Sequence, residues 1–159
     1  MAIFMTLLAV AVLVIVDQVV KLWAVTSLAS IGSIPLIPGV FQLTYVENRG
    51  AAFSLLENHQ GLFIFFAFVV IGVICTVLYK KYIQTPLGQV ALILVCAGAV
   101  GNLIDRIFRN FVVDMIHFSL IDFPVFNVAD IFVCTGVALF FYYMIFQHKE
   151  DEEKDTAES

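Results

Sequence analysis

The sequence is 159 residues long, and 62% of its residues are hydrophobic while 13% are charged. A soluble domain carries roughly 25% charged residues, so this composition, with a mean hydropathy of +1.01, excludes a soluble fold and indicates an integral membrane protein. The net charge of −5 comes mainly from residues 148–159, where six acidic residues stand against two lysines. We expect one membrane domain, residues 1–147, and a disordered acidic tail; the nearly neutral remainder gives no sign of a nucleic-acid partner.

Four apolar segments are long enough to cross a bilayer, which takes about 20 residues. No basic residue precedes the first segment, and it is longer than the apolar part of a signal peptide, so we predict an uncleaved span. The four predicted transmembrane helices cover residues 3–25, 61–79, 87–106 and 127–146. The sequence therefore predicts an all-α membrane protein whose longer loops are residues 26–60 and 107–125.

The loop of residues 26–60 contains a turn signal followed by a strand signal. Pro35–Gly39 holds two prolines and a glycine, which favours a turn. Phe41–Tyr45 alternates between apolar and polar residues, which favours a short strand. The second loop carries Asp114 in an apolar setting, and we interpret that stretch as irregular.

The order of the spans determines which segments share a side of the membrane. Each helix enters where the previous one left, so both long loops lie on one side, face A, and both chain termini lie on the other, face B. The basic residues are Lys80, Lys81, Lys149 and Lys154 on face B against Arg49, Arg106 and Arg109 on face A. Because cytoplasmic loops are enriched in basic residues, this small excess predicts that face B is cytoplasmic.

Two charged residues lie within the first span. Asp17 and Lys21 are four residues apart, which places them on one face of a helix, with the acid on the N-terminal side as helical ion pairs prefer. One interpretation is an intrahelical pair that neutralises two charges near the interface. The other is that the pair supports a functional site on face A.

The third span ends in a cluster of small and polar residues. Gly98, Asn102, Asp105 and Arg106 recur at spacings of three and four, so they form one stripe on the helix. Small residues allow helices to approach closely, but packing alone does not explain an amide, a carboxylate and a guanidinium together. We interpret these polar groups as a hydrogen-bonding scaffold for a nearby site.

The segment of residues 48–54 lies on the same face and combines polar and small side chains. Asn48, Arg49 and Gly50 open this segment. It is either a simple turn or a stretch of backbone that approaches a ligand closely. In the second case Arg49 could hold a lipid phosphate and Asn48 could bind a peptide carbonyl.

Two further carboxylates, Asp114 and Asp130, are predicted to meet near face A. Asp130 follows Asn127 by three residues at the start of the fourth span, where the third span has just ended. Two close carboxylates away from bulk water share one proton, and such a pair supplies both a base for water and an acid for an amide. The pattern favours peptide hydrolysis without a covalent intermediate, against the alternative of two unrelated interfacial carboxylates.

Other kinds of chemistry have weaker support in the sequence. The histidines are dispersed and no His-Glu-x-x-His motif occurs, so no metal site is expected. A serine dyad of Ser54 and Lys21 stays open on chemical grounds. A proton-coupled transporter is a further alternative, although the charges gather at one face rather than at mid-membrane, and a purely structural membrane protein is another.

Five segments in this order resemble the motifs of one family. They are residues 17–21, 48–53, 98–106, 113–114 and 126–130, and with the four spans they cover nearly the whole chain. The sequence is similar to lipoprotein signal peptidase, also called signal peptidase II, the bacterial aspartyl protease of the inner membrane.

This resemblance implies four transmembrane helices, a small extracytoplasmic β-cradle and a short periplasmic helix. It implies that Asp114 and Asp130 are the catalytic dyad, supported by Asn48, Asn102, Arg106 and Asn127, with Asp17 and Lys21 shaping the site. The implied substrate is a prolipoprotein that carries diacylglycerol and is cut just before its lipobox cysteine. No cofactor is implied. The resemblance also implies that globomycin is an inhibitor and that membrane lipid is a partner. It implies that both termini are cytoplasmic and that the site is extracytoplasmic.

Overall fold

The computed structural model of the chain describes residues 3–50, 59–121 and 123–147. Among them are four helices long and apolar enough to cross a membrane, which confirms the predicted number of spans. The first is α1 (Ile3–Trp23), extended by the π-helical turn η1 (Ala24–Leu28) and by α2 (Ala29–Ile31); the others are α3 (Gln60–Tyr79), α4 (Pro86–Arg109) and α5 (Val128–Tyr142), extended by η3 (Tyr143–Gln147).

Helix α4 is the centre of the bundle, and α1, α3 and α5 all pack against it. Half of its most apolar stretch is buried, whereas the other spans expose most of theirs. On α3, for example, Phe65, Phe66 and Phe68 are each more than half exposed. Such continuous apolar faces are stable against hydrocarbon rather than water, so the chain is a multi-pass membrane protein.

Glycines bring α4 and α5 into close contact. A Cβ atom on Gly136 of α5 would lie 2.7 Å from the Ala91 carbonyl oxygen of α4. A Cβ atom on Gly98 of α4 would overlap the Ala129 carbonyl oxygen of α5. Close backbone approach of this kind is typical of small residues at membrane helix interfaces, and it holds the end of α4 beside the start of α5.

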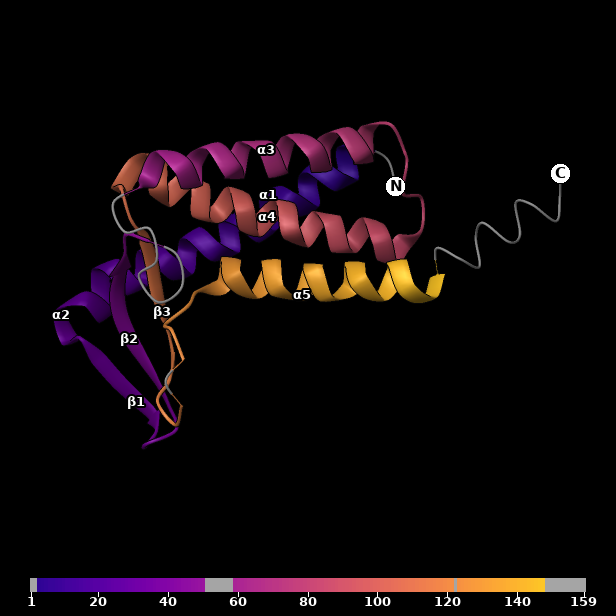
Figure 1. Ribbon diagram of the computed structural model, residues 1–159. Coiled ribbons are helices and arrows are strands. Elements are labelled where there is room, and N and C mark those ends of the chain that lie inside the picture. The colour runs from indigo at the N-terminus through magenta and orange to yellow at the C-terminus, as the bar shows by residue number, and fades with distance from the viewer. Residues whose placement is uncertain (1–2, 51–58, 122, 148–159) are drawn as a thin grey trace, which may run out of the picture.

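Three antiparallel strands form a small sheet at one end of the bundle. They are β1 (Ser33–Ile37), β2 (Phe41–Asn48) and β3 (Val112–Phe118), with β2 in the centre. The sheet lies at the opposite end of the molecule from the start of α1 and the α3–α4 connection (Figure 1). A buried cluster of Ala24, Leu28, Val113 and Met115 attaches the sheet to the end of the first helix.

Strand β3 corrects the prediction that residues 107–125 are an irregular loop around Asp114. Its run of β-branched and apolar residues pairs with β2, and Val46 of β2 lies opposite Asp114. This pairing joins segments far apart in the chain, so no local pattern identified it. The predicted strand at Phe41–Tyr45 is confirmed and lies within β2.

Three predicted boundaries differ from the structure. The first helix continues to Ile31 and α4 continues to Arg109, where Asn110 adopts a left-handed conformation. The predicted turn at Pro35–Gly39 is shorter, because Pro35 to Ile37 belong to β1 and the bend lies at Gly39, whose φ is 73°. The expected short helix of this loop and the acidic tail cannot be assigned, since residues 51–58 and 148–159 lie outside the described residues.

Candidate active site

Strand β3 and the first turn of α5 position Asp114 and Asp130. Asp114 is 1% exposed and lies in the part of β3 that pairs with the end of β2. Asp130 is the third residue of α5, and its backbone N–H donates to the side-chain oxygen of Asn127, the residue that caps the helix, at 3.0 Å. The two carboxylates come from different elements but converge at the sheet end of the bundle.

Asn127 is the residue that joins the two carboxylates. Its side-chain Nδ2 donates to Oδ1 of Asp114 at 2.6 Å. Its backbone N–H donates to Oδ2 of Asp130 at 3.1 Å, which completes a capping box at the start of α5. One buried asparagine therefore holds both members of the predicted pair.

Two more asparagines occupy the remaining carboxylate oxygens. Asn48 at the end of β2 donates from Nδ2 to Oδ2 of Asp114 at 2.9 Å. Asn102 of α4 donates from Nδ2 to Oδ1 of Asp130 at 2.8 Å. All four carboxylate oxygens of Asp114 and Asp130 thus accept an N–H bond.

Groups that can only donate fix the orientation of these amides. The Gly50 backbone N–H donates to Oδ1 of Asn48 at 3.0 Å, and the Lys21 ammonium donates to Oδ1 of Asn102 at 2.8 Å. An amide whose oxygen accepts such a bond must direct its NH₂ group the other way. In both residues that direction is toward a carboxylate.

Burial raises the pKa of Asp114 to about 7, with the nearby charge of Asp130 as the second cause. The hydrogen bonds from Asn48 and Asn127 oppose this shift without cancelling it. Two neighbouring carboxylates in a poorly solvated site cannot both ionise easily. Asp114 is therefore suited to carry a proton near neutral pH.

A fully buried ionic network around Lys21 is connected to the carboxylate pair through Asn102. The Lys21 ammonium lies 3.0 Å from Oδ2 of Asp17 and 3.0 Å from Oδ2 of Asp105. With the bond to Asn102, all three ammonium protons have acceptors. The predicted intrahelical Asp17–Lys21 pair is confirmed, and Lys21 also links α1 to α4 through Asp105 and Asn102.

Asp17 also anchors α5. Its Oδ1 accepts the Ala129 backbone N–H at 2.9 Å. A Cβ atom on Gly101 would lie 2.6 Å from its Oδ2, so a larger residue at this position of α4 would displace the Asp17 carboxylate. Asp17 thereby fixes the start of α5, the segment that carries Asp130.

The polar side chains of the predicted stripe on α4 contact different partners. Asn102 reaches the carboxylate pair, while Asp105 binds Lys21, the Arg109 guanidinium and, at 3.2 Å, the Val113 backbone N–H. Arg106 donates to the Gly50 carbonyl at 3.4 Å and lies over the Phe63 ring at 4.8 Å. The Nε of Arg106 is buried and has no hydrogen-bond partner among the described residues.

Arg49 lies apart from the carboxylates. Its guanidinium pairs with the partly exposed Glu47 at 2.9 Å and lies 5.4 Å from the centre of the Phe111 ring. Within the described ranges it forms no bond to Asp114 or Asp130. Ala51 to Ser54 of the same segment lie outside those ranges.

Sequence reasoning assigned no role to Gln18 and Arg109. Gln18 donates to the Gly101 carbonyl at 3.1 Å and accepts from Arg109 at 3.5 Å. Arg109 in turn binds Asp105. The available signal was a glutamine beside Asp17 within an apolar span, where an amide needs a partner.

Residues 9–146 match the model of the family described as signal peptidase (SPase) II. Together with the four membrane-spanning helices, this match defines the chain as a membrane-embedded aspartic peptidase. The chain belongs to the signal peptidase II family. Its chemistry is therefore cleavage of signal peptides from lipoproteins.

Relatives and solved structures agree with this membership. Lipoprotein signal peptidase of Clostridioides difficile (strain 630) is 42% identical over 88% of this chain and 94% of its own length. The protein of the same name from Streptococcus thermophilus (strain CNRZ 1066) is 44% identical over 82% and 86%. A bacterial membrane enzyme determined by the in meso method at 2.3 Å superimposes with a TM-score of 0.83 at 33% identity, over 91% of this chain and 89% of that one.

Proposed function

We propose that the chain hydrolyses the peptide bond just before a diacylglyceryl-modified cysteine of prolipoproteins, with a water molecule activated between Asp114 and Asp130. The observation that carries this proposal is the shared contact with Asn127, which donates to Asp114 at 2.6 Å and to Asp130 at 3.1 Å. Membership of the signal peptidase II family supports the substrate class. The lipid on the substrate follows from the family resemblance.

The hydrogen bonds favour different roles for the two carboxylates. Asp130 is the base, because Asn102 and the ammonium of Lys21 behind it favour a negative charge there. Asp114, with its raised pKa, is the acid. Asp130 takes a proton from water as the oxygen attacks the carbonyl carbon, while Asp114 gives its proton to the carbonyl oxygen. When the gem-diol collapses, Asp130 returns the proton to the leaving amine and a hydroxyl proton restores Asp114.

The location of the pair suits a substrate that stays in the bilayer. Asp130 lies one turn into α5, where this span meets the sheet. Acyl chains could remain against the exposed apolar sides of the helices while the peptide reaches the carboxylates. Arg106 has a buried Nε–H without a described partner, and we assign it to a carbonyl of the substrate backbone.

The orientation we propose places face A outside the cytoplasm. The sheet and the carboxylate pair then lie on the extracytoplasmic side of a bacterial inner membrane, and both termini lie in the cytoplasm. The exposed Lys80 and Lys81 at the opposite end of the bundle agree with the enrichment of basic residues in cytoplasmic loops.

The purified protein is expected to cleave a lipobox peptide that carries diacylglycerol and to leave the same unmodified peptide intact. The lipid anchors the peptide at the level of the bilayer where the pair lies. Cleavage is measured by mass spectrometry of the products in mixed micelles, and globomycin should block it as a non-cleaved substrate mimic. Equal cleavage of both peptides would contradict a lipid requirement, whereas cleavage of neither would contradict the proposed reaction.

The rate is expected to fall as the pH rises through about 7. Asp114 has a raised pKa of about 7, so it loses its proton there and the acid is lost. Because the reaction also needs an ionised base, the profile of kcat/KM against pH should be bell-shaped. A rate that stays constant from about pH 6 to about pH 9 would show that Asp114 is not the acid.

A further inference from the structure

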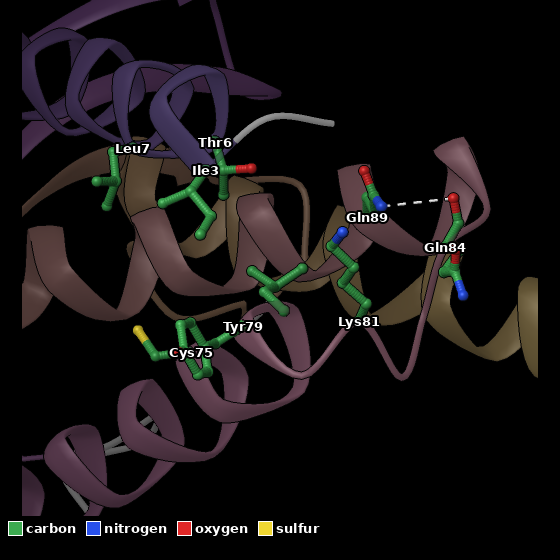
Figure 2. A pocket seen from close by; sticks show the side chains of 9 residues that line it. Ile3, Thr6, Leu7, Cys75, Tyr79, Lys81, Gln84 and Gln89 are labelled. Carbon is green, nitrogen blue, oxygen red and sulfur yellow. Dashed lines mark hydrogen bonds between the residues drawn. The ribbon is translucent and has the colours of Figure 1, made fainter.

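A second candidate binding site lies at the end of the bundle opposite to the carboxylate pair. It is a cleft of about 560 Å³ between the start of α1, the end of α3 and the start of α4 (Figure 2). This volume falls within the roughly 300–1,000 Å³ of pockets that hold small organic ligands. The proposed peptidase reaction makes no use of the cleft.

The walls of the cleft formed by α1 and α3 are mostly apolar. Ile3 and Leu7 of α1 lie across the cleft from Cys75 and Tyr79 of α3 (Figure 2). The exposed fractions of Ile3 and Leu7 are 57% and 64%. In a membrane-spanning protein a space with such walls is filled by hydrocarbon rather than by water, so these walls suit an acyl chain.

The other end of the cleft is polar and positively charged. Lys81, Gln84 and Gln89 line it, and the Lys81 side chain points toward Gln89 (Figure 2). None of the described residues that line the cleft is acidic, and Lys81 forms no ion pair with any described residue. A basic group between helices at headgroup level attracts a lipid phosphate.

Lys81 occupies a backbone position at the end of α3 that favours glycine. The end of α3 is a Schellman motif: the Tyr82 N–H donates to the Val77 carbonyl at 3.1 Å and the Lys81 N–H to the Leu78 carbonyl at 3.2 Å. Lys81 occupies its left-handed position with a φ of 56°, where glycine is the favoured residue. A lysine there strains the backbone in a way that glycine would not, which agrees with a role for its side chain.

We propose that this cleft binds one anionic phospholipid, with the phosphate on the Lys81 ammonium and an acyl chain along Ile3 and Leu7. The charge of the polar end and the apolar walls together select this ligand. The site is independent of the peptidase reaction, because it lies at the far end of the helices.

The test compares phosphatidylglycerol with phosphatidylcholine of the same acyl chains. The full chain is purified in a neutral detergent, each lipid is titrated, and native mass spectrometry counts the bound molecules. Wild-type protein is expected to retain one phosphatidylglycerol in preference to phosphatidylcholine. Lys81→Gly is expected to lower that preference about fivefold, the effect of one basic residue at a membrane surface, while raising the thermal midpoint of the lipid-free protein because glycine relieves the strained φ.

Lys80→Gln is the matched control, because Lys80 is adjacent and exposed but does not line the cleft. It should keep the preference for phosphatidylglycerol, and Leu7→Trp should lower the binding of both lipids by filling the cleft. Glycerol phosphate, which lacks acyl chains, should not shift the thermal midpoint. Equal binding of the two lipids to the wild type, an equal loss in Lys80→Gln, or a shift by glycerol phosphate would each overturn the proposal.

Discussion

Asp114→Asn and Asp130→Asn are each expected to abolish cleavage of the lipidated peptide while the protein still inserts and folds. An asparagine at position 130 cannot take a proton from water, and one at position 114 cannot give a proton to the carbonyl oxygen. General acid or base catalysis contributes about 10²–10⁴-fold to a rate, so each variant should lose at least that much in kcat. The measurement is product formation under single-turnover conditions, which separates chemistry from product release.

Folding of the Asp114→Asn variant has its own expected signature. Because burial raises the pKa of Asp114, the wild type contains an uncharged carboxyl at low pH and a poorly solvated charge above about pH 7. The same carboxyl ionises near its ordinary pKa of 3.8 in the unfolded chain, so the wild type loses stability as the pH rises from about 4 to about 7. The asparagine variant has no such charge, so this fall of stability with pH should be absent from it, although it loses the hydrogen bond from either Asn48 or Asn127 because an amide offers one acceptor oxygen.

Glu47→Gln is the matched control for both aspartate variants, since it makes the same carboxylate-to-amide change on β2. Glu47 is partly exposed and pairs with Arg49 rather than with either aspartate. It should retain cleavage close to the wild-type rate. Turnover in a correctly folded Asp114→Asn or Asp130→Asn variant would remove that residue from the dyad.

The helical part of this fold was predictable because the bilayer imposes a length. Four apolar stretches of about 20 residues locate four spans, and the order of the spans places the polar ends of α4 and α5 at one end of the bundle. That argument brought Asp130 and Asn127 together with Asn102 before any contact was known. The helix ends were less predictable, because η1 and α2 continue the first helix beyond the residues that cross the membrane.

The sheet and the buried network were harder to predict for a common reason. Strand β3 exists because it pairs with β2 some 60 residues earlier, where Asn48 lies opposite Val112. Similarly, the i,i+4 spacing of Asp17 and Lys21 predicted their pair but not the second carboxylate, Asp105, which α4 supplies. Local spacing identifies partners on one helix, while partners from other elements depend on the packing of the whole bundle.

Replacing Lys21 by methionine is expected to destabilise the protein by about 3–5 kcal/mol, the typical effect of removing one partner from a buried ion pair. Lys21, Asp17 and Asp105 are all fully buried. Without the ammonium, the network keeps two negative charges, on Asp17 and Asp105, and one described cation, the Arg109 guanidinium bound to Asp105. The free energy of unfolding is measured in mild detergent. Lys80→Met, at an exposed position, should change it by less than about 0.5 kcal/mol.

A double variant separates lost charge pairing from lost packing at Lys21. Asp17→Asn combined with Lys21→Met removes one negative and one positive charge, so Asp105 and Arg109 remain as a balanced pair. If unpaired charge causes the loss of stability, the double variant should be more stable than Lys21→Met alone, although each change removes native contacts. The single variant Asp17→Asn completes the cycle, because it measures the loss of the Asp17 contacts by itself. If the losses of the two single variants simply add in the double variant, the Lys21 ammonium does not act by compensating Asp17. In both variants that lack Lys21, the Asn102 oxygen loses the bond from the Lys21 ammonium and keeps the bond from Asn127. The activity that remains therefore measures how well Asn127 alone directs the Asn102 amide toward Asp130.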